Sequence, residues 1–439
     1  MKAVAQSLRP IRGGHPGTRR SIAALPLVLC LILALMPRAA LAQKAPAQKA
    51  MAQKAMSSSP ESPLAARLDA VIDRAVAEKR LVGAVVLVAE DGRVVYHRAA
   101  GLADREANKP MREDAIFRLS SLSKPLVSAL VMRLVQDSRL RLTDPVTRWL
   151  PGFRPLLPDG SRPVIRLSQL LNHTSGLSYR FNAPKGYAYD RLNVSDGLDQ
   201  PGLSLVENLG RLGQTTLLFP PGASWHYSLG LDVLGAVAAT AVAESLPQAM
   251  RAMITEPLNL ADTGFTVTDP ARLAAPYADG KPAPTRMTEN MALPLLGGAV
   301  IFSPGRVLNP ASYPSGGAGM VGTAGDYLKF LETIRTGGGP ILRPETVALM
   351  MTDQVGFQAQ SQGPGWGFGY GWAVLDDPSA ANTPQAKGTI AWGGVYGHSW
   401  FVDPVRKITV VALTNTAFEG MNGRFPTEVR DAVYGTAGL

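Results

Sequence analysis

Strand signals stand at the two ends of this chain, and short helical pieces in a Pro- and Gly-rich stretch occupy the middle. Near the start, two β-branched runs flank Glu90-Asp91-Gly92, which is typical of a hairpin. Strands must pair, so we expect one sheet that draws on both ends of the chain, with the middle as an insertion. The predicted strands are 82–88, 93–99, 369–375, 389–392, 399–402 and 408–413.

Apolar residues at helical spacing predict helices around this sheet. We expect them from near Leu64, over 121–136, over 229–244 in the middle and over 426–434 at the end. The predicted fold class is α+β, an antiparallel sheet flanked by helices with an inserted all-α region. One domain, 64–439, then consists of an α/β part from 64–140 and 320–439 and a helical insertion over 141–319.

Residues 1–42 have the pattern of a signal peptide. Basic residues precede an apolar run from Ile22 to Met36, and Ala40-Leu41-Ala42 supplies the small residues that a signal peptidase needs. Arg19-Arg20 leaves twin-arginine export open beside the general route. A membrane anchor is the alternative, but the run is shorter than the roughly 20 residues that a spanning helix requires. We expect a periplasmic or secreted protein that meets the membrane only during export.

Charge and cysteine content exclude several classes of function. The expected signal peptide, 1–42, holds six of the 44 Lys and Arg residues and no acidic residue. The other 397 residues therefore carry 38 basic and 34 acidic groups, and they contain no run of basic residues. This pattern argues against a nucleic-acid partner. The single cysteine, Cys30, lies in the leader, so no disulfide or thiol nucleophile is expected in the mature chain. Segment 43–63, which repeats Ala-Gln-Lys-Ala, reads as a disordered linker.

The first pattern with chemical content is Ser121-Leu122-Ser123-Lys124. Residues three apart share one face of a helix, so the Ser121 hydroxyl and the Lys124 amine come within hydrogen-bond reach. This is a nucleophile with a base beside it. The spacing alone also fits a serine cap followed by a solvated lysine. Apolar residues bury much of this helix, however, and burial disfavours the charged form of a lysine.

Five further segments match, in order, a known set of motifs. With Ser121-x-x-Lys124, the chain resembles the serine β-lactamase and penicillin-recognising superfamily, in the class C-like branch that includes the family VIII carboxylesterases. The resemblance covers about residues 65–435. The segments are LLNHTSGL at 170–177, PGASWHYS at 221–228, EPL at 256–258 with Asp262-Thr263, GGAGM at 316–320 with Asp326-Tyr327, and GYGW at 369–372.

The resemblance implies that Tyr227 is the second half of the base. The family's Y-x-N element maps onto Tyr227-Ser228-Leu229, and a phenol beside a cation can relay a proton. A core tyrosine packed beside Trp225 is the alternative. Leu229 replaces the asparagine whose amide contacts the side chain of a β-lactam, which puts antibiotic hydrolysis in doubt.

The family's K-T-G element is replaced by Trp392-Gly393-Gly394. The resemblance implies that the glycines let substrate lie close to the strand, and that the amides of Val395 and Ser121 form an oxyanion hole. A tryptophan cannot pair with the carboxylate of a penicillin, and W-x-G is the form that family VIII carboxylesterases show. The alternative is a glycine bulge in a strand.

The four histidines of the mature chain show no metal-ligand spacing, and no dinucleotide or Walker fingerprint occurs, so we expect no metal and no cofactor. His173 is expected in a structural turn, while His398 either lines the site or lies on the surface at a strand end.

The sequence therefore predicts an exported serine hydrolase that forms an acyl-enzyme on Ser121 with a small-molecule ester or amide substrate, and carboxylic esters are the preferred class. A β-lactamase or D-alanyl carboxypeptidase-type activity stays open. So does a non-catalytic sensor of β-lactams or peptidoglycan, which is acylated and stops.

Overall fold

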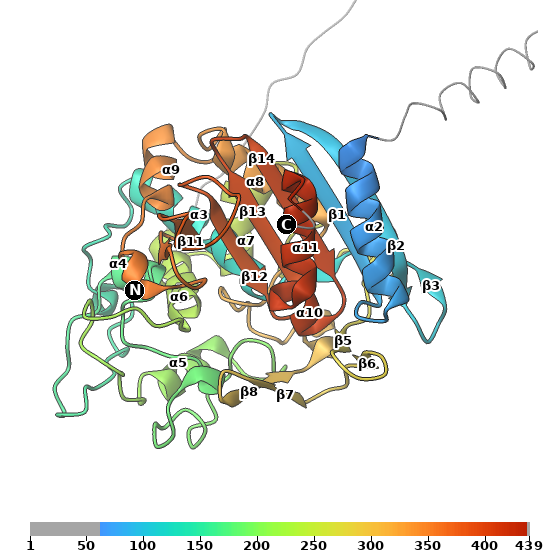
Figure 1. Cartoon of the computed structure of the whole chain (residues 1–439). Coiled ribbons are helices and arrows are strands. Elements are labelled where there is room, and N and C mark those ends of the chain that lie inside the picture. The colour runs from blue at the N-terminus through green and yellow to red at the C-terminus, as the bar shows by residue number, and fades with distance from the viewer. Residues whose placement is uncertain (1–61, 437–439) are drawn as a thin grey trace, which may run out of the picture. The chain divides into compact units, whose positions relative to one another are not determined.

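The computed structural model describes residues 62–436 (Figure 1). The expected signal peptide, 1–42, and nearly all of the expected linker, 43–63, lie outside the described residues. Among the described helices, none is by itself long and apolar enough to cross a membrane. The pair α6 (Gly230–Val242) and Leu246–Thr255 meets the length and composition criteria together, but it is bent by 82°.

One eight-stranded antiparallel sheet joins the two ends of the described chain. Its strands are β1 (Gly83–Glu90), β2 (Arg93–Asp104), β3 (Lys109–Pro110), β10 (Trp366–Phe368), β11 (Ala373–Leu375), β12 (Ile390–Gly394), β13 (His398–Asp403) and β14 (Ile408–Thr414). They are ordered β10-β11-β12-β13-β14-β1-β2-β3. Val85 of β1 lies opposite Leu413 of β14 and opposite Ala99 of β2, so the first hairpin is extended by the last strand. The predicted fold class is confirmed.

Helices cover both faces of this sheet, which explains why β1 is apolar at every position before Glu90. Val85 and Leu87 point into the larger core, and Val86 and Val88 point into the smaller one. The smaller core lies under α2 (Pro63–Ala77) and α11 (Arg424–Tyr434), which run side by side on one face in Figure 1. The larger core contains α3 (Ser123–Gln136) and α8 (Ala324–Arg335).

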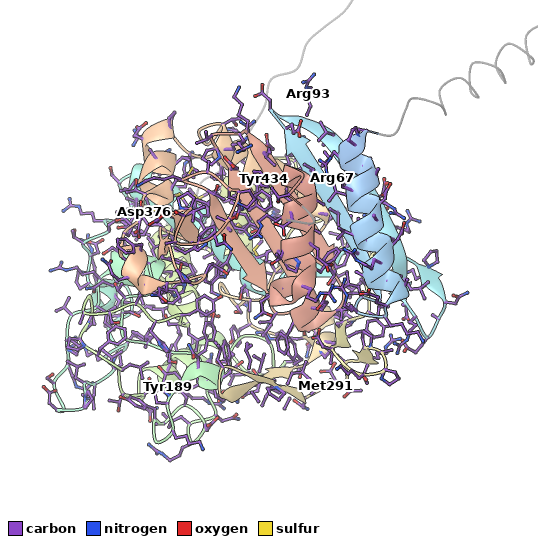
Figure 2. All side chains as sticks on the ribbon, viewed as in Figure 1. Arg67, Arg93, Tyr189, Met291, Asp376 and Tyr434 are labelled. Atoms are coloured by element: carbon purple, nitrogen blue, oxygen red, sulfur yellow. The ribbon has the colours of Figure 1, made fainter. Side chains whose placement is uncertain are left out.

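Local signals and polar contacts hold the outer helices. Ser62 caps α2 by accepting a hydrogen bond from the Ala65 amide at 3.1 Å, and Pro63 begins the helix. The Arg67 guanidinium donates to the carbonyl of Ala432 at 2.7 Å, which ties α2 to α11 (Figure 2). The Tyr434 hydroxyl donates to Asp403 at 2.6 Å, which ties α11 to the end of β13.

The insertion at 141–319 is mainly helix and loop, but it is not wholly α. Its strands are β5 (Tyr277–Ala278), β6 (Thr285–Arg286), β7 (Met291–Leu295) and β8 (Gly298–Phe302), and its helices include α4 (Leu167–Leu171), α5 (Leu205–Leu212), α6 and α7 (Leu246–Met250). The β7–β8 turn places Leu296 and Gly297 at φ of 51° and 88°. A type I′ hairpin turn needs positive φ at both central residues, and a leucine at the first of these positions gives no turn signal.

One expected strand is present only in its second half. Residues 369–375 were predicted as a single strand, but Gly369–Trp372 form the turn between β10 and β11. Gly371 has a φ of 115°, a value that breaks a strand and that side chains rarely allow. The other predicted strands and helices are present, with shifts of up to five residues at their ends. The remaining helices are α9 (Pro344–Met351) and α10 (Ala417–Asn422).

Candidate active site

The turn that carries Ser121 is strained. After β4 (Phe117–Arg118), which pairs with β9 (Val321–Gly322), Ser120 has a φ of 45°. A 3-10 turn over Ser120–Leu122 then leads into α3. A non-glycine residue at positive φ costs about 1–3 kcal/mol and is found where a site needs a particular backbone shape. This backbone conformation places Ser121 at the N-terminal end of α3, where the helix dipole favours developing negative charge.

Lys124 is held below Ser121 inside the molecule. Its side chain is 1% exposed, because α3 is apolar on nearly all sides and lies between packed elements. The side-chain nitrogen donates to the carbonyl of Gly317 at 2.7 Å and to Ser121 Oγ at 3.3 Å. It also lies 4.7 Å from the ring centre of Tyr227 and 5.2 Å from that of Tyr179. The amine is thus directed at the nucleophile rather than at solvent.

Tyr227 reaches the same oxygen from the other side. Its hydroxyl donates to Ser121 Oγ at 2.8 Å, although the two residues are 106 positions apart. The structure therefore brings together Ser121, Lys124 and Tyr227 as the sequence predicts. A hydroxyl can both donate and accept, so these three groups form a continuous path for a proton.

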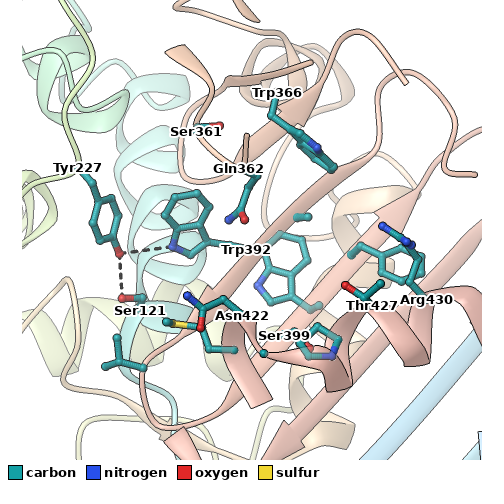
Figure 3. A pocket seen from close by; sticks show the side chains of 18 of the residues that line it. Ser121, Tyr227, Ser361, Gln362, Trp366, Trp392, Ser399, Asn422, Thr427 and Arg430 are labelled. Carbon is teal, nitrogen blue, oxygen red and sulfur yellow. Dashed lines mark hydrogen bonds between the residues drawn. The ribbon is translucent and has the colours of Figure 1, made fainter. Parts of the chain in front are cut away.

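Aromatic rings fix Tyr227 in this position. Trp392 packs 5.1 Å from its ring, and the indole N–H donates to the Tyr227 hydroxyl at 3.4 Å (Figure 3). His173 packs 4.8 Å away, with its Nδ1 accepting from the Ser228 amide at 3.3 Å. Burial, together with the charge of Lys124, lowers the pKa of His173 well below its ordinary value. His173 thus acts as a neutral support for Tyr227, in a turn with a φ of 60°.

The sequence analysis expected both glycines of β12 to leave room for substrate, but only one of them lines the cavity. A methyl group on Gly394 would lie 2.7 Å from Ser120 Oγ and 2.8 Å from the carbonyl oxygen of Leu119. Gly394 therefore lets the strand approach the nucleophile turn, and it does not line the cavity. A methyl group on Gly393 would meet Met421 of α10 at 2.9 Å. Gly393 and Val395 do line the cavity beside Ser121.

A cavity of about 630 Å³ opens over Ser121. Figure 3 shows it extending from Ser121 and Tyr227, past Trp392, towards Thr427 and Arg430 on α11. Its walls are mostly apolar. The lining side chains that sequence reasoning missed include Phe181, Asn182, Leu295, Leu296, Ser361, Gln362, Trp366, Gln385, Ser399 and Asn422.

Two other residues lie away from the positions expected for them. His398 is neither on the surface nor in the cavity: it is 1% exposed, and its Nε2 contacts the carbonyl of Arg118 at 2.8 Å. Burial lowers its pKa to about 4. Leu229 is fully buried in the core at the start of α6, so its position presents no side chain to substrate. Within residues 62–436, no three His, Cys, Asp or Glu side chains gather in a way that could hold a metal ion.

The fold and the Ser121–Lys124–Tyr227 arrangement define a serine hydrolase of the β-lactamase and transpeptidase type. A family model described as Beta-lactamase matches residues 68–433. The chain therefore belongs to the beta-lactamase family, and it is an enzyme.

One similar protein is named as an esterase. The chain is 54% identical over 375 residues to Esterase EstB of Burkholderia gladioli, an alignment that covers 84% of this chain and 95% of that protein. The solved structure of EstCE1, described as a hydrolase with promiscuous acyltransferase activity, matches with a TM-score of 0.84 at 50% identity, over 85% of this chain and 99% of that one. Simvastatin synthase LovD of Aspergillus terreus, as its LovD6 mutant, shares the fold with a TM-score of 0.69 at 22% identity, over 88% and 97% of the two chains.

Proposed function

We propose that this protein hydrolyses small, uncharged carboxylic esters through an acyl-enzyme on Ser121, with Lys124 and Tyr227 as the base. The two contacts to Ser121 Oγ, at 2.8 Å from Tyr227 and 3.3 Å from Lys124, support the assignment of the base. The esterase name of a relative that is 54% identical supports the class of substrate.

The proposed chemistry needs only groups of this chain and water. Ser121 Oγ attacks the ester carbonyl while its proton passes through Tyr227 to the side-chain amine of Lys124. Backbone amides of Ser121 and Val395 hold the oxyanion. The tetrahedral intermediate collapses, the carbonyl–alkoxide bond breaks, and the departing oxygen takes the proton as the alcohol. A water then attacks the acyl-Ser121 ester, returns a proton to Ser121 and releases the carboxylic acid.

The charge of the cavity is the observation that favours neutral esters over penicillins. Among the described residues that line it, Arg430 is the only charged one. Arg430 lies at the end of the cavity away from Ser121 in Figure 3 and is already paired with Asp431 at 2.7 Å. Lys124 lies beneath Ser121 and does not line the cavity, so a substrate carboxylate bound there would lose water without meeting a charged side chain of the cavity wall, which costs several kcal/mol.

Parallel assays of a p-nitrophenyl butyrate ester and a chromogenic cephalosporin test the proposal. We expect kcat/KM to be at least about tenfold higher for the ester, a difference of about 1.4 kcal/mol. Equal or faster cephalosporin turnover would establish the β-lactamase alternative instead. One equivalent of released product followed by no turnover would establish the sensor.

Two substitutions at one position isolate the role of charge. Trp392→Phe and Trp392→Lys both remove the indole N–H, but only the lysine adds a cation. We expect Trp392→Lys to raise the ratio of cephalosporin to ester turnover above that of Trp392→Phe, because a charge-assisted hydrogen bond contributes about 1.5–3 kcal/mol. Equal ratios in the two variants would contradict this explanation of specificity.

We also propose that the chain is exported and that residues 1–42 are removed, on the basis of the basic, apolar and Ala-Leu-Ala pattern alone. N-terminal sequencing of protein recovered from the periplasm should begin at Gln43. Recovery of the uncut chain from the cytoplasm would contradict the proposal.

A further inference from the structure

A buried carboxylate near Lys124 does not line the cavity, and the proposed mechanism does not use it. Asp232 is the third residue of α6 and is 1% exposed. Both of its carboxylate oxygens are buried without a hydrogen-bond partner among the described residues, and so is the hydroxyl of Tyr179. Unpaired buried polar groups are costly, and in a native structure they require an explanation.

These unpaired atoms converge with Lys124 on one point beside Gly317. A methyl group placed on Gly317 would lie 2.6 Å from Asp232 Oδ2, 3.1 Å from the Tyr179 hydroxyl and 3.5 Å from Lys124 Nζ. The carboxylate oxygen is therefore within about 6 Å of the amine. Only a glycine at 317 lets the three groups approach this closely, and the carbonyl of the same glycine accepts from Lys124 at 2.7 Å.

Opposite charges at this distance inside a protein interact strongly, because little water screens them. Burial raises the pKa of Asp232, while Lys124, Arg306, and the nearby Ser315 hydroxyl and Gly317 amide act in the opposite direction. Lys124 also faces Ser121, Tyr227 and the neutral ring of His173. The N-terminal end of α6 adds a positive dipole that favours an anion at Asp232.

We propose that Asp232 is a positioning residue of the hydrolysis: its carboxylate stabilises the ammonium that forms when Lys124 takes the proton of Ser121. The inference rests on the proposed function. Asp232 touches neither substrate nor Ser121. It acts through the charge of Lys124, whose side-chain nitrogen also lies 5.2 Å from the ring centre of Tyr179. Attack by Ser121 then creates a cation next to an existing anion, which lowers the cost of separating charge in the core.

Asp232→Asn tests the proposal through the pH dependence of kcat/KM for p-nitrophenyl butyrate. Without the anion, the protonated amine is less stable, so the neutral base persists to lower pH. We expect the midpoint of the acid limb to move down by about one pH unit, the size of shift that a nearby charge gives. We expect the plateau to fall about tenfold, because a weaker base takes the proton less readily, with KM little changed. A midpoint and plateau equal to those of the wild type would overturn the proposal.

The melting temperature separates this role from a structural one. Asparagine has the shape of aspartate and removes the cost of keeping a charge buried, so Tm should stay the same or rise while activity falls. Asp144→Asn is the matched control. Asp144 is also buried, but it accepts from the Arg141 amide at 3.1 Å and from Arg148 at 3.2 Å, and Lys124 is not among its partners. The Asp144→Asn substitution should lower Tm and leave the midpoint of the acid limb unchanged. A shifted midpoint in this variant would overturn the proposal.

Gly317→Ala gives a second measurement if Asp232→Asn does not fold. The added methyl group must push the Asp232 carboxylate away from Lys124, because 2.6 Å is closer than such atoms approach. The pH midpoint should again move down, and an unchanged or raised midpoint would contradict the role of Asp232. A wild-type protein that fails to cleave the ester would refute the proposed function itself. An active wild type with unshifted variants would refute only this inference.

Discussion

Gly394→Ala adds one methyl group at the point where β12 meets the turn that carries Ser121. The methyl carbon would lie 2.8 Å from the carbonyl oxygen of Leu119, and ordinary contact begins at 3.4 Å, so the strand and the turn must separate by about 0.6 Å. The Ser120 hydroxyl, at 2.7 Å, can rotate away, but a backbone carbonyl cannot. The separation therefore moves Ser121 relative to Val395 and Trp392.

The magnitude follows from the displacement. A misplacement of 1 Å in an active site costs about 100-fold in rate, or about 2.7 kcal/mol. In proportion, 0.6 Å costs about 1.6 kcal/mol, so we expect kcat/KM for a p-nitrophenyl ester to fall roughly 15-fold. Overpacking should also lower the free energy of unfolding by about 1–3 kcal/mol, measured by chemical denaturation.

Gly264→Ala is the control for this substitution. The backbone of Gly264 also pairs with a strand residue, Val321 of β9, but a methyl group on Gly264 would meet nothing within 4 Å. We expect full activity and unchanged or slightly higher stability. A folded Gly394→Ala protein with kcat/KM within about twofold of the wild type would refute the reasoning, because the contact to Leu119 would then not set the geometry.

Three further substitutions test other parts of the site and the fold. Ser121→Ala should abolish ester turnover with Tm unchanged, and more than about a tenth of the wild-type kcat would contradict its role as nucleophile. Tyr227→Phe keeps the ring but removes the hydroxyl at 2.8 Å from Ser121, so kcat should fall at least about 100-fold with little change in KM, whereas a rise in KM alone would point to substrate binding. His398→Gln tests stability against pH. Burial lowers the pKa of His398 to about 4, below the ordinary 6.5, so its neutral form favours the folded state above pH 6.5. About 3 kcal/mol of that stability is lost as the pH falls from 6.5 to 4. Chemical denaturation at pH 7.5 and 4.5 should show a smaller loss in the variant, and an equal loss would contradict the assignment.

Features that depend on neighbours in the chain could be predicted from the sequence. The β-branched runs on either side of Asp91-Gly92 predict the first hairpin, and apolar spacing from Leu68 to Ala75 predicts α2. Both are local patterns with a fixed period. Ser121 and Lys124 lie three apart, so the geometry of a helix alone brings them together. The first hairpin also had only one source of further partner strands, which was the other end of the chain.

Features that depend on how distant elements pack were decided by the tertiary structure. Nothing near Asp232 in the sequence shows that it lies close to Lys124, because the approach depends on α3, α6 and the segment around Gly317 meeting in the core. The same holds for the bond from Trp392 to Tyr227 across 165 residues. A glycine at 394 fits both a close approach of substrate and a close approach of the turn that carries Ser121. Only the contact to Leu119 shows that it is the turn that lies against Gly394. A local pattern fixes which atoms a segment can offer, whereas the packing of segments fixes which of those atoms meet.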